Sequence, residues 1–160
     1  MKQLRNQCSP RALAACKKPH VVGQTSPVYR WPIPVMVIGA SQGPQAPVRA
    51  MVRQEPGFFL VAESETGAAA LALVFRWQPA VVLVEVSLAD RNAFEVVKCI
   101  RHLVPACAAI LLSNAPDPCV QEVARAIGAK AVWHKGGGLN DLRHTLRCLV
   151  HNAWFGQPLS

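Results

Sequence analysis

A carboxylate, a hydroxyl and an ammonium each stand at the end of an apolar run, and these three residues are Glu85, Ser113 and Lys135. A hydroxyl and an ammonium can bind the oxygens of a phosphoryl group beside a carboxylate that receives it. A fourth apolar run, residues 35–38, ends instead in Gly39-Ala40, which carries no charge. The set is typical of a phosphoryl-transfer site, but it lacks the extra carboxylates with which such sites usually hold Mg²⁺.

The apolar runs have the near-continuous hydrophobicity of buried parallel strands. Between them lie stretches with helical spacing of apolar residues, bounded by Pro, Gly and capping residues. We predict strands at residues 35–38, 58–62, 80–86, 108–112 and 131–134. Helices are predicted from Gly43-Pro44 to Gln54, from Thr66 to Trp77, at 93–103, at 118–127, and from Leu139 to about His151.

This alternation predicts an α/β fold with a five-stranded parallel sheet and helices on both faces. Five such units fit the flavodoxin-like strand order 2-1-3-4-5, in which the strand order reverses between the first and third strands. Because ligands of such sheets bind at that reversal, the expected crevice lies between Gly39-Ala40 and Glu85.

The charge of the chain is concentrated at its start. The net charge is +8 over 160 residues, and residues 1–30 contain six basic and no acidic side chains. We expect residues 1–33 to be a basic, disordered extension, 34–151 to be the folded domain, and 152–160 to be a tail. The extension could contact nucleic acid or anionic lipid weakly, although a solvated leader is the simpler interpretation.

No apolar stretch is long enough to span a bilayer, and no secretory or organellar signal is convincing. The six cysteines are widely spaced and form no Cys-x-x-Cys pair. In a chain without a secretory signal, such cysteines are expected to be reduced thiols. We therefore expect a cytoplasmic protein.

Residues 34–151 resemble the receiver domain of bacterial response regulators, the CheY-like domain of two-component signalling. The stretch from Met51 to Phe58 resembles the subfamily whose output domain is a helix-turn-helix (LuxR-type), and residues 126–131 are similar to the family's passage before its fifth strand. Residues 149–155 resemble the exit toward the linker of that output domain. Because the sequence ends at Ser160, we expect the output domain to be absent.

The resemblance implies a role for each rim position. Glu85 takes the place of the phospho-accepting aspartate, and Ser113 and Lys135 take the places of the residues that contact the phosphoryl group. The acidic pair that holds Mg²⁺ falls on Gly39 and Ala40, so the metal site is predicted to be lost and no cofactor is expected. The aromatic switch position falls on Val132, a small side chain that cannot swing as a ring does.

These substitutions predict a phosphorylation-independent pseudo-receiver without enzymatic activity. Glu85 could imitate phosphoaspartate by bonding to both Lys135 and Ser113, or it could merely pair with Lys135, and the sequence leaves both open. The alternative is a regulator fragment that has lost its DNA-binding output domain and still accepts phosphate weakly at Glu85 or Asp90. The expected partners are a second copy of the chain, a histidine kinase or a separate output protein. In the resemblance, dimers form through the last helix and the fifth strand, together with the helix before that strand.

Two other interpretations follow from local patterns. The segment from Gly39 to Gly43 resembles a glycine-rich nucleotide loop, but Pro44 and Gln45 stand where a further glycine is needed. Three residues with metal-binding side chains, His144, Cys148 and His151, share one face of the last predicted helix. Such a face can supply at most three ligands for a soft metal, and an interaction surface is the simpler interpretation.

Overall fold

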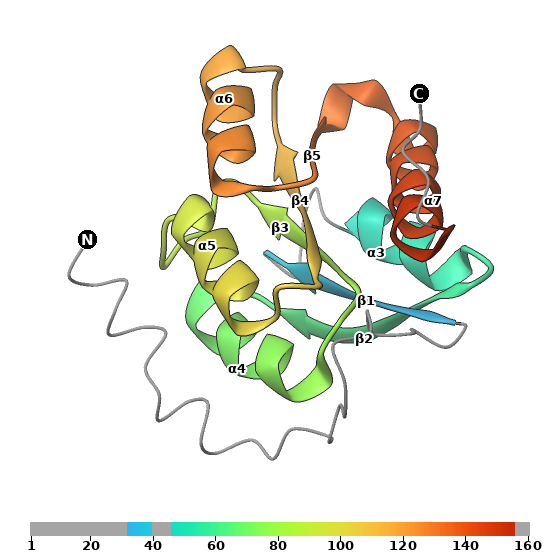
Figure 1. Ribbon diagram of the computed structural model, residues 1–160. Coiled ribbons are helices and arrows are strands. Elements are labelled where there is room, and N and C mark those ends of the chain that lie inside the picture. Colours follow the sequence, from blue (N-terminus) through green and yellow to red (C-terminus); the bar gives the residue numbers. More distant parts are fainter. Residues whose placement is uncertain (1–31, 40–45, 156–160) are drawn as a thin grey trace.

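The structure is a computed structural model that describes residues 32–39 and 46–155 (Figure 1). It contains a parallel sheet with the strand order β2-β1-β3-β4-β5, which confirms the predicted topology. The strands are β1 (Ile33–Ile38), β2 (Phe58–Ser64), β3 (Val81–Glu85), β4 (Ala108–Ser113) and β5 (Ala131–His134). The helices are α3 (Ala46–Gln54), α4 (Gly67–Trp77), α5 (Ala93–Leu103), α6 (Pro118–Ile127) and α7 (Leu139–Phe155).

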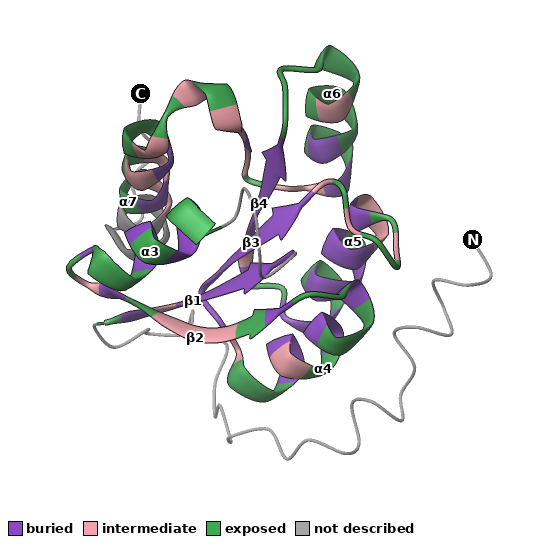
Figure 2. Ribbon diagram, turned by 180° about the vertical axis from the view of Figure 1, so that it is seen from behind, coloured by how far each residue is buried: buried purple, intermediate pink, exposed green. Residues whose placement is uncertain are grey.

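The helices cover both faces of the sheet. Helices α4, α5 and α6 lie on one face, and α3 and α7 lie on the other (Figure 1). Each face has its own core cluster, because alternate residues of a strand point to opposite faces. In β3, for example, Val82 and Val84 belong to the cluster under α4–α6, whereas Val81 and Leu83 belong to the cluster under α3 and α7. The central strands are buried on both sides (Figure 2).

The helix ends follow local sequence signals. The side chains of Thr66, Asn92 and Asp117 accept hydrogen bonds from the first turns of α4, α5 and α6, which satisfies amides that have no partner within the helix. Gly128 ends α6 in the left-handed conformation, with φ 80°. These caps fix where α4, α5 and α6 begin and where α6 ends.

Several element boundaries differ from the prediction. Strand β1 begins earlier, at Ile33, and includes Pro34. Proline has no backbone N–H to donate. It is tolerated at Pro34 because this residue precedes the first residue pair between β1 and β3, where no backbone donor is needed. Strand β2 continues to Ser64 past an irregularity opposite Val35/Met36, and α7 continues beyond its predicted end to Phe155.

The glycine run at residues 136–138 is partly ordered, although its composition is typical of a flexible bend. A short 3₁₀ turn spans Lys135–Gly137 and leads from β5 toward α7. No helix among the described residues is long and apolar enough to cross a membrane.

Candidate functional site

The carboxyl ends of the strands bring the predicted residues to one rim of the sheet. Glu85 is the last residue of β3, Ser113 is the last of β4, and Lys135 directly follows β5. Gly39 directly follows β1, beside the end of β3, because Ile38 pairs with Val84. Ala40 lies outside the described residues. We refer to the ends of the five strands, with residues Gly39, Glu63, Glu85, Ser113 and Lys135, as the rim.

Glu85 and Lys135 form an ion pair at the rim. The Lys135 Nζ lies 3.1 Å from Glu85 Oε1, and the lysine and glutamate side chains are only 19% and 10% exposed. Lys135 also donates a hydrogen bond of 2.7 Å to Asn114 Oδ1. The ammonium is therefore held between β3 and the loop after β4. Sequence reasoning missed Asn114, although its position directly after Ser113 could have suggested a role at the rim.

Ser113 does not complete the expected arrangement. Its hydroxyl donates to the Ala115 carbonyl at 2.8 Å, within its own loop. A hydroxyl has one proton to donate, so this bond uses the donor that Glu85 would need. Of the two contacts that would imitate phosphoaspartate, the structure contains the one from Lys135.

At the end of β1, a guanidinium lies where the resemblance places an acidic pair. Arg49 of α3 donates from Nη2 to the Gly39 carbonyl at 3.1 Å, and its Nε lies 3.5 Å from Glu63 Oε1. Glu63 also pairs with Arg53 at 2.8 Å. No pattern in the sequence pointed to Arg49 or Glu63 at this place.

The donors at this place do not fit a divalent metal. Mg²⁺ requires hard oxygen ligands, usually including carboxylates, in near-octahedral geometry. Gly39 offers no carboxylate, and its carbonyl already accepts from Arg49. The carboxylates of Glu63 and Glu85 are each engaged by basic side chains. A metal ion here would have to displace or approach these cations.

Asp90, the alternative acceptor, is turned toward a helix. Its two carboxylate oxygens accept hydrogen bonds from the Gly67 and Ala68 amides at 2.9 and 3.1 Å, at the first turn of α4. Burial opposes ionisation of this carboxyl, but the Gly67, Ala68 and Asp90 amides and the Arg91 charge outweigh it, so the pKa of Asp90 is lowered. Asp90 thus ties the loop after β3 to α4.

The switch position and its neighbour face opposite sides of β5. Val132 is half-buried and packs against the cluster under α4–α6. The aromatic side chain in this strand is Trp133, which is buried in the cluster under α3 and α7 and donates from Nε1 to the Gly138 carbonyl at 3.0 Å. The strand period therefore keeps this ring away from the position that the resemblance gives to an aromatic switch.

The metal-binding face suggested for α7 contains one close pair. Cys148 Sγ lies 3.4 Å from His144 Nε2, and the side chain of His151 lies outside the described residues. No group of three or more His, Cys, Asp or Glu side chains suited to a metal occurs in the described part of the chain.

The cysteines differ in their state. Cys107, Cys119 and Cys148 are free, as expected, and burial raises the pKa of the Cys107 thiol to about 12. Cys99 is not among the free thiols of the described residues.

Glu55 is another charged side chain that sequence reasoning missed. It directly follows α3, is 5% exposed, and pairs with Arg143 Nε at 2.6 Å and with Arg147. The two arginines are four residues apart on α7, so they lie on one face of that helix. This spacing is visible in the sequence, but the sequence does not show which carboxylate the two arginines meet.

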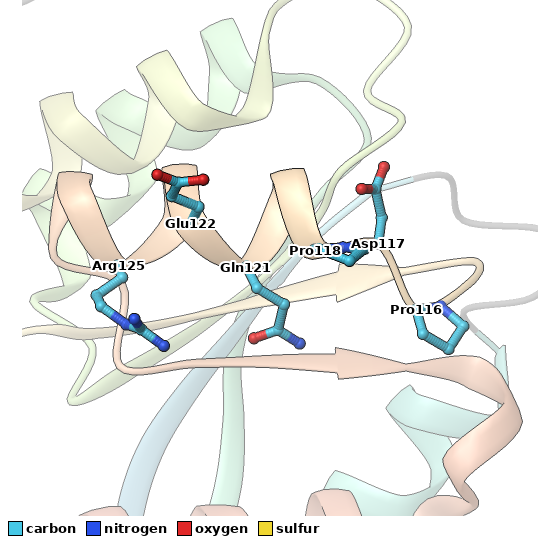
Figure 3. Close-up of a pocket in the computed structure, with 6 residues that line it drawn as sticks. All are labelled: Pro116, Asp117, Pro118, Gln121, Glu122 and Arg125. Carbon is cyan, nitrogen blue, oxygen red and sulfur yellow. The ribbon is translucent and has the colours of Figure 1, made fainter.

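A shallow groove lies along α6, and none of the rim residues lines it. It has a volume of about 540 Å³, and Figure 3 shows Asp117, Gln121, Glu122 and Arg125 along the helix, with Pro116 and Pro118 at its start. Asp117 serves there as the helix cap. The lining mixes acidic and basic side chains and carries no constellation typical of catalysis.

The chain has the fold of response regulator receiver domains. A LuxR-family two-component response regulator from Aurantimonas superposes with a TM-score of 0.70 at 18% identity, over 75% of this chain and 86% of that one. A LuxR-family DNA-binding response regulator from Staphylococcus aureus gives 0.62 at 22% identity, over 72% and 97%. The isolated receiver domain of RcsB from Salmonella enterica serovar Typhimurium, with the phosphomimetic BeF₃⁻, gives 0.65 at 18% identity, over 73% and 87%. The sequence matches no family model and no curated protein.

Proposed function

We propose that this chain is a pseudo-receiver, a signalling domain that works through protein–protein contacts without accepting phosphate. The receiver fold supports a role in two-component signalling. The observation that carries the proposal is the contact of Lys135 with Glu85, together with the uncharged Gly39 at the end of β1. The carboxylate that would receive phosphate is already neutralised, and the site lacks acidic ligands where the metal would bind.

The longer side chain of glutamate also opposes phosphorylation. Its extra methylene moves the carboxylate about an ångström from the place of an aspartate, and in-line transfer is sensitive to such a displacement. Without a metal, the charge that develops on the phosphoryl oxygens during transfer would lack its usual counter-ion. The proposed domain therefore has no enzymatic activity and needs no cofactor. We further propose that it acts in the cytoplasm on a protein partner. That partner is a second copy, a histidine kinase or a separate output protein.

A titration with Mg²⁺ and beryllofluoride, followed by backbone amide NMR, tests the proposal. For the natural chain we expect no shift at Glu85, Ser113 or Lys135 at millimolar ligand. The matched control restores the lost carboxylates, with Gly39→Asp, Ala40→Asp and Glu85→Asp in one chain. Shifts at these residues in the control alone would support the proposal and show that the assay works.

Two outcomes would favour the alternative. Saturable shifts in the natural chain, or incorporation of phosphate from acetyl phosphate, would indicate a weak phospho-acceptor and would overturn the proposal. The retained Ser113 and Lys135 are the observation in favour of that alternative. A Glu85→Gln variant would then assign the acceptor, since the hydrogen bonds of Asp90 to α4 occupy the other candidate.

A further inference from the structure

Arg49 is a buried cation at the rim. The residue is 5% exposed although it carries a permanent charge. A charge so removed from water needs compensation by partners, and Arg49 has them in the Gly39 carbonyl and the Glu63 carboxylate. These contacts join α3 to the ends of β1 and β2.

The side chains around Arg49 alternate in charge across the sheet. In strand order, Glu63 lies near the end of β2, Arg49 lies at Gly39 after β1, Glu85 ends β3, and Lys135 follows β5. By the period of β3, Glu85 falls on the same face as Leu83, which is the face covered by α3. The two carboxylates thus flank the strand end at which the guanidinium is held.

We propose that Arg49 is the resident cation of the rim. It supplies at Gly39 the positive charge that a receiver-type site would take from a divalent metal, and it keeps such a metal out. This inference rests on the proposed function, because it explains how the fold keeps its rim neutral without a metal. The exclusion has two causes: a guanidinium repels a divalent cation, and it occupies oxygens that the cation would need.

Removing the guanidinium should therefore create affinity for a hard divalent cation. The test uses the full chain and Mn²⁺, whose paramagnetism broadens nearby amide signals. For Arg49→Met we expect local broadening at Gly39, Ser64 and Val86, with an apparent affinity at least about tenfold tighter than that of the natural chain. Adding Glu63→Gln to this variant should abolish the gain.

Arg53→Met is the matched control. It removes the same charge from the same helix and also takes one cation from Glu63, but the Arg53 side chain is 60% exposed and contacts no rim carbonyl among the described hydrogen bonds. We expect it to leave Mn²⁺ binding unchanged. If Arg53→Met gained as much affinity as Arg49→Met, the effect would be one of net charge, and the proposal would be wrong.

A second variant guards against unfolding. Arg49→Gln removes the charge but keeps an amide that can donate to the Gly39 carbonyl, so we expect it to gain Mn²⁺ affinity, although less than Arg49→Met does. If a folded Arg49→Gln chain shows no gain, the proposal is overturned. Beryllofluoride binding by the natural chain would overturn the proposed function instead, so the two failures are distinguishable.

Discussion

Lys135 holds the rim in its present arrangement through two hydrogen bonds, one to Glu85 and one to Asn114. The pair with Glu85 is mostly shielded from water, so removal of one partner leaves the other with a poorly solvated charge. This contact alone does not reproduce the contacts expected of a phosphorylated receiver, because Ser113 bonds elsewhere. It does explain why a glutamate is tolerated at the end of a buried strand.

Lys135→Met should lower the free energy of unfolding by about 1–3 kcal/mol, because Glu85 would lose its charged partner. Adding Glu85→Gln should recover part of this loss, since no unpaired carboxylate would remain. Urea denaturation of the two variants and the natural chain measures both effects. An equal loss in the single and double variants would mean that the two side chains do not interact.

Asp90 should contribute stability that depends on pH. Its folded pKa lies below the ordinary value of 3.8, so the contribution is present in full above that value and is lost as the pH falls through the folded pKa. Because water screens this carboxyl, we expect the natural chain and Asp90→Asn to differ by at most about 1 kcal/mol near neutral pH. The gap should close below 3.8. Denaturation curves between neutral and acid pH measure it, and a gap that persists in acid would contradict the assignment.

Helix α6 is held at both ends by side chains from different parts of the sequence. Asp117 caps the first turn of α6. In the last turn, the Ile127 carbonyl accepts a hydrogen bond of 2.9 Å from Arg101 of α5. The left-handed Gly128 makes room for that guanidinium, because a Cβ at this position would overlap Arg101 Nη1. The end of α6 therefore depends on both a backbone conformation and a neighbouring helix.

Gly128→Ala should lower the free energy of unfolding by about 1–2 kcal/mol, from backbone strain and displacement of Arg101. Gly128→Ala in an Arg101→Met background is the control for strain alone, since no guanidinium is then displaced by the added Cβ. Thermal denaturation should show a smaller loss from Gly128→Ala in that background than in the natural chain. Equal losses in the two backgrounds would show that the contact with Arg101 adds nothing.

At the scale of the whole molecule, two apolar side chains on different described elements are equally exposed. Val123 on α6 and Phe59 on the edge strand β2 are both 41% exposed. The receiver resemblance places dimer contacts on the surface of α6, β5 and α7, which includes Val123 and not Phe59. The pair therefore offers a direct comparison between the expected partner surface and another part of the protein.

If the chain dimerises as expected, Val123→Glu should weaken the dimer by at least about tenfold, because a charge would be desolvated in the interface. Phe59→Glu should leave the dissociation constant unchanged. Sedimentation equilibrium over a range of concentrations measures both. If Phe59→Glu alone weakened the dimer, the interface would lie at the β2 edge instead.

Much of this fold follows from local signals in the sequence. Apolar runs predicted the strands of the described sheet, and capping residues and glycine placed α4, α5 and α6 within a residue of their observed bounds. The parallel order then brought Glu85, Ser113 and Lys135 to one rim, since strand ends meet at one edge of such a sheet. Errors occurred at Pro34, at the end of β2 and in α7, where pairing or packing continued an element past its local signal.

By itself, the sequence determined the strand order and the residue types present at the rim, because both depend on hydrophobic periodicity and on short connections. Only the tertiary structure decided which charges meet. Arg49 reaches Gly39 and Glu63, Asp90 turns to α4, and Glu55 receives two arginines of α7. Each of these contacts joins groups from different elements. Their formation depends on how helices cross the sheet and on side-chain rotamers, which no local pattern in the chain specifies.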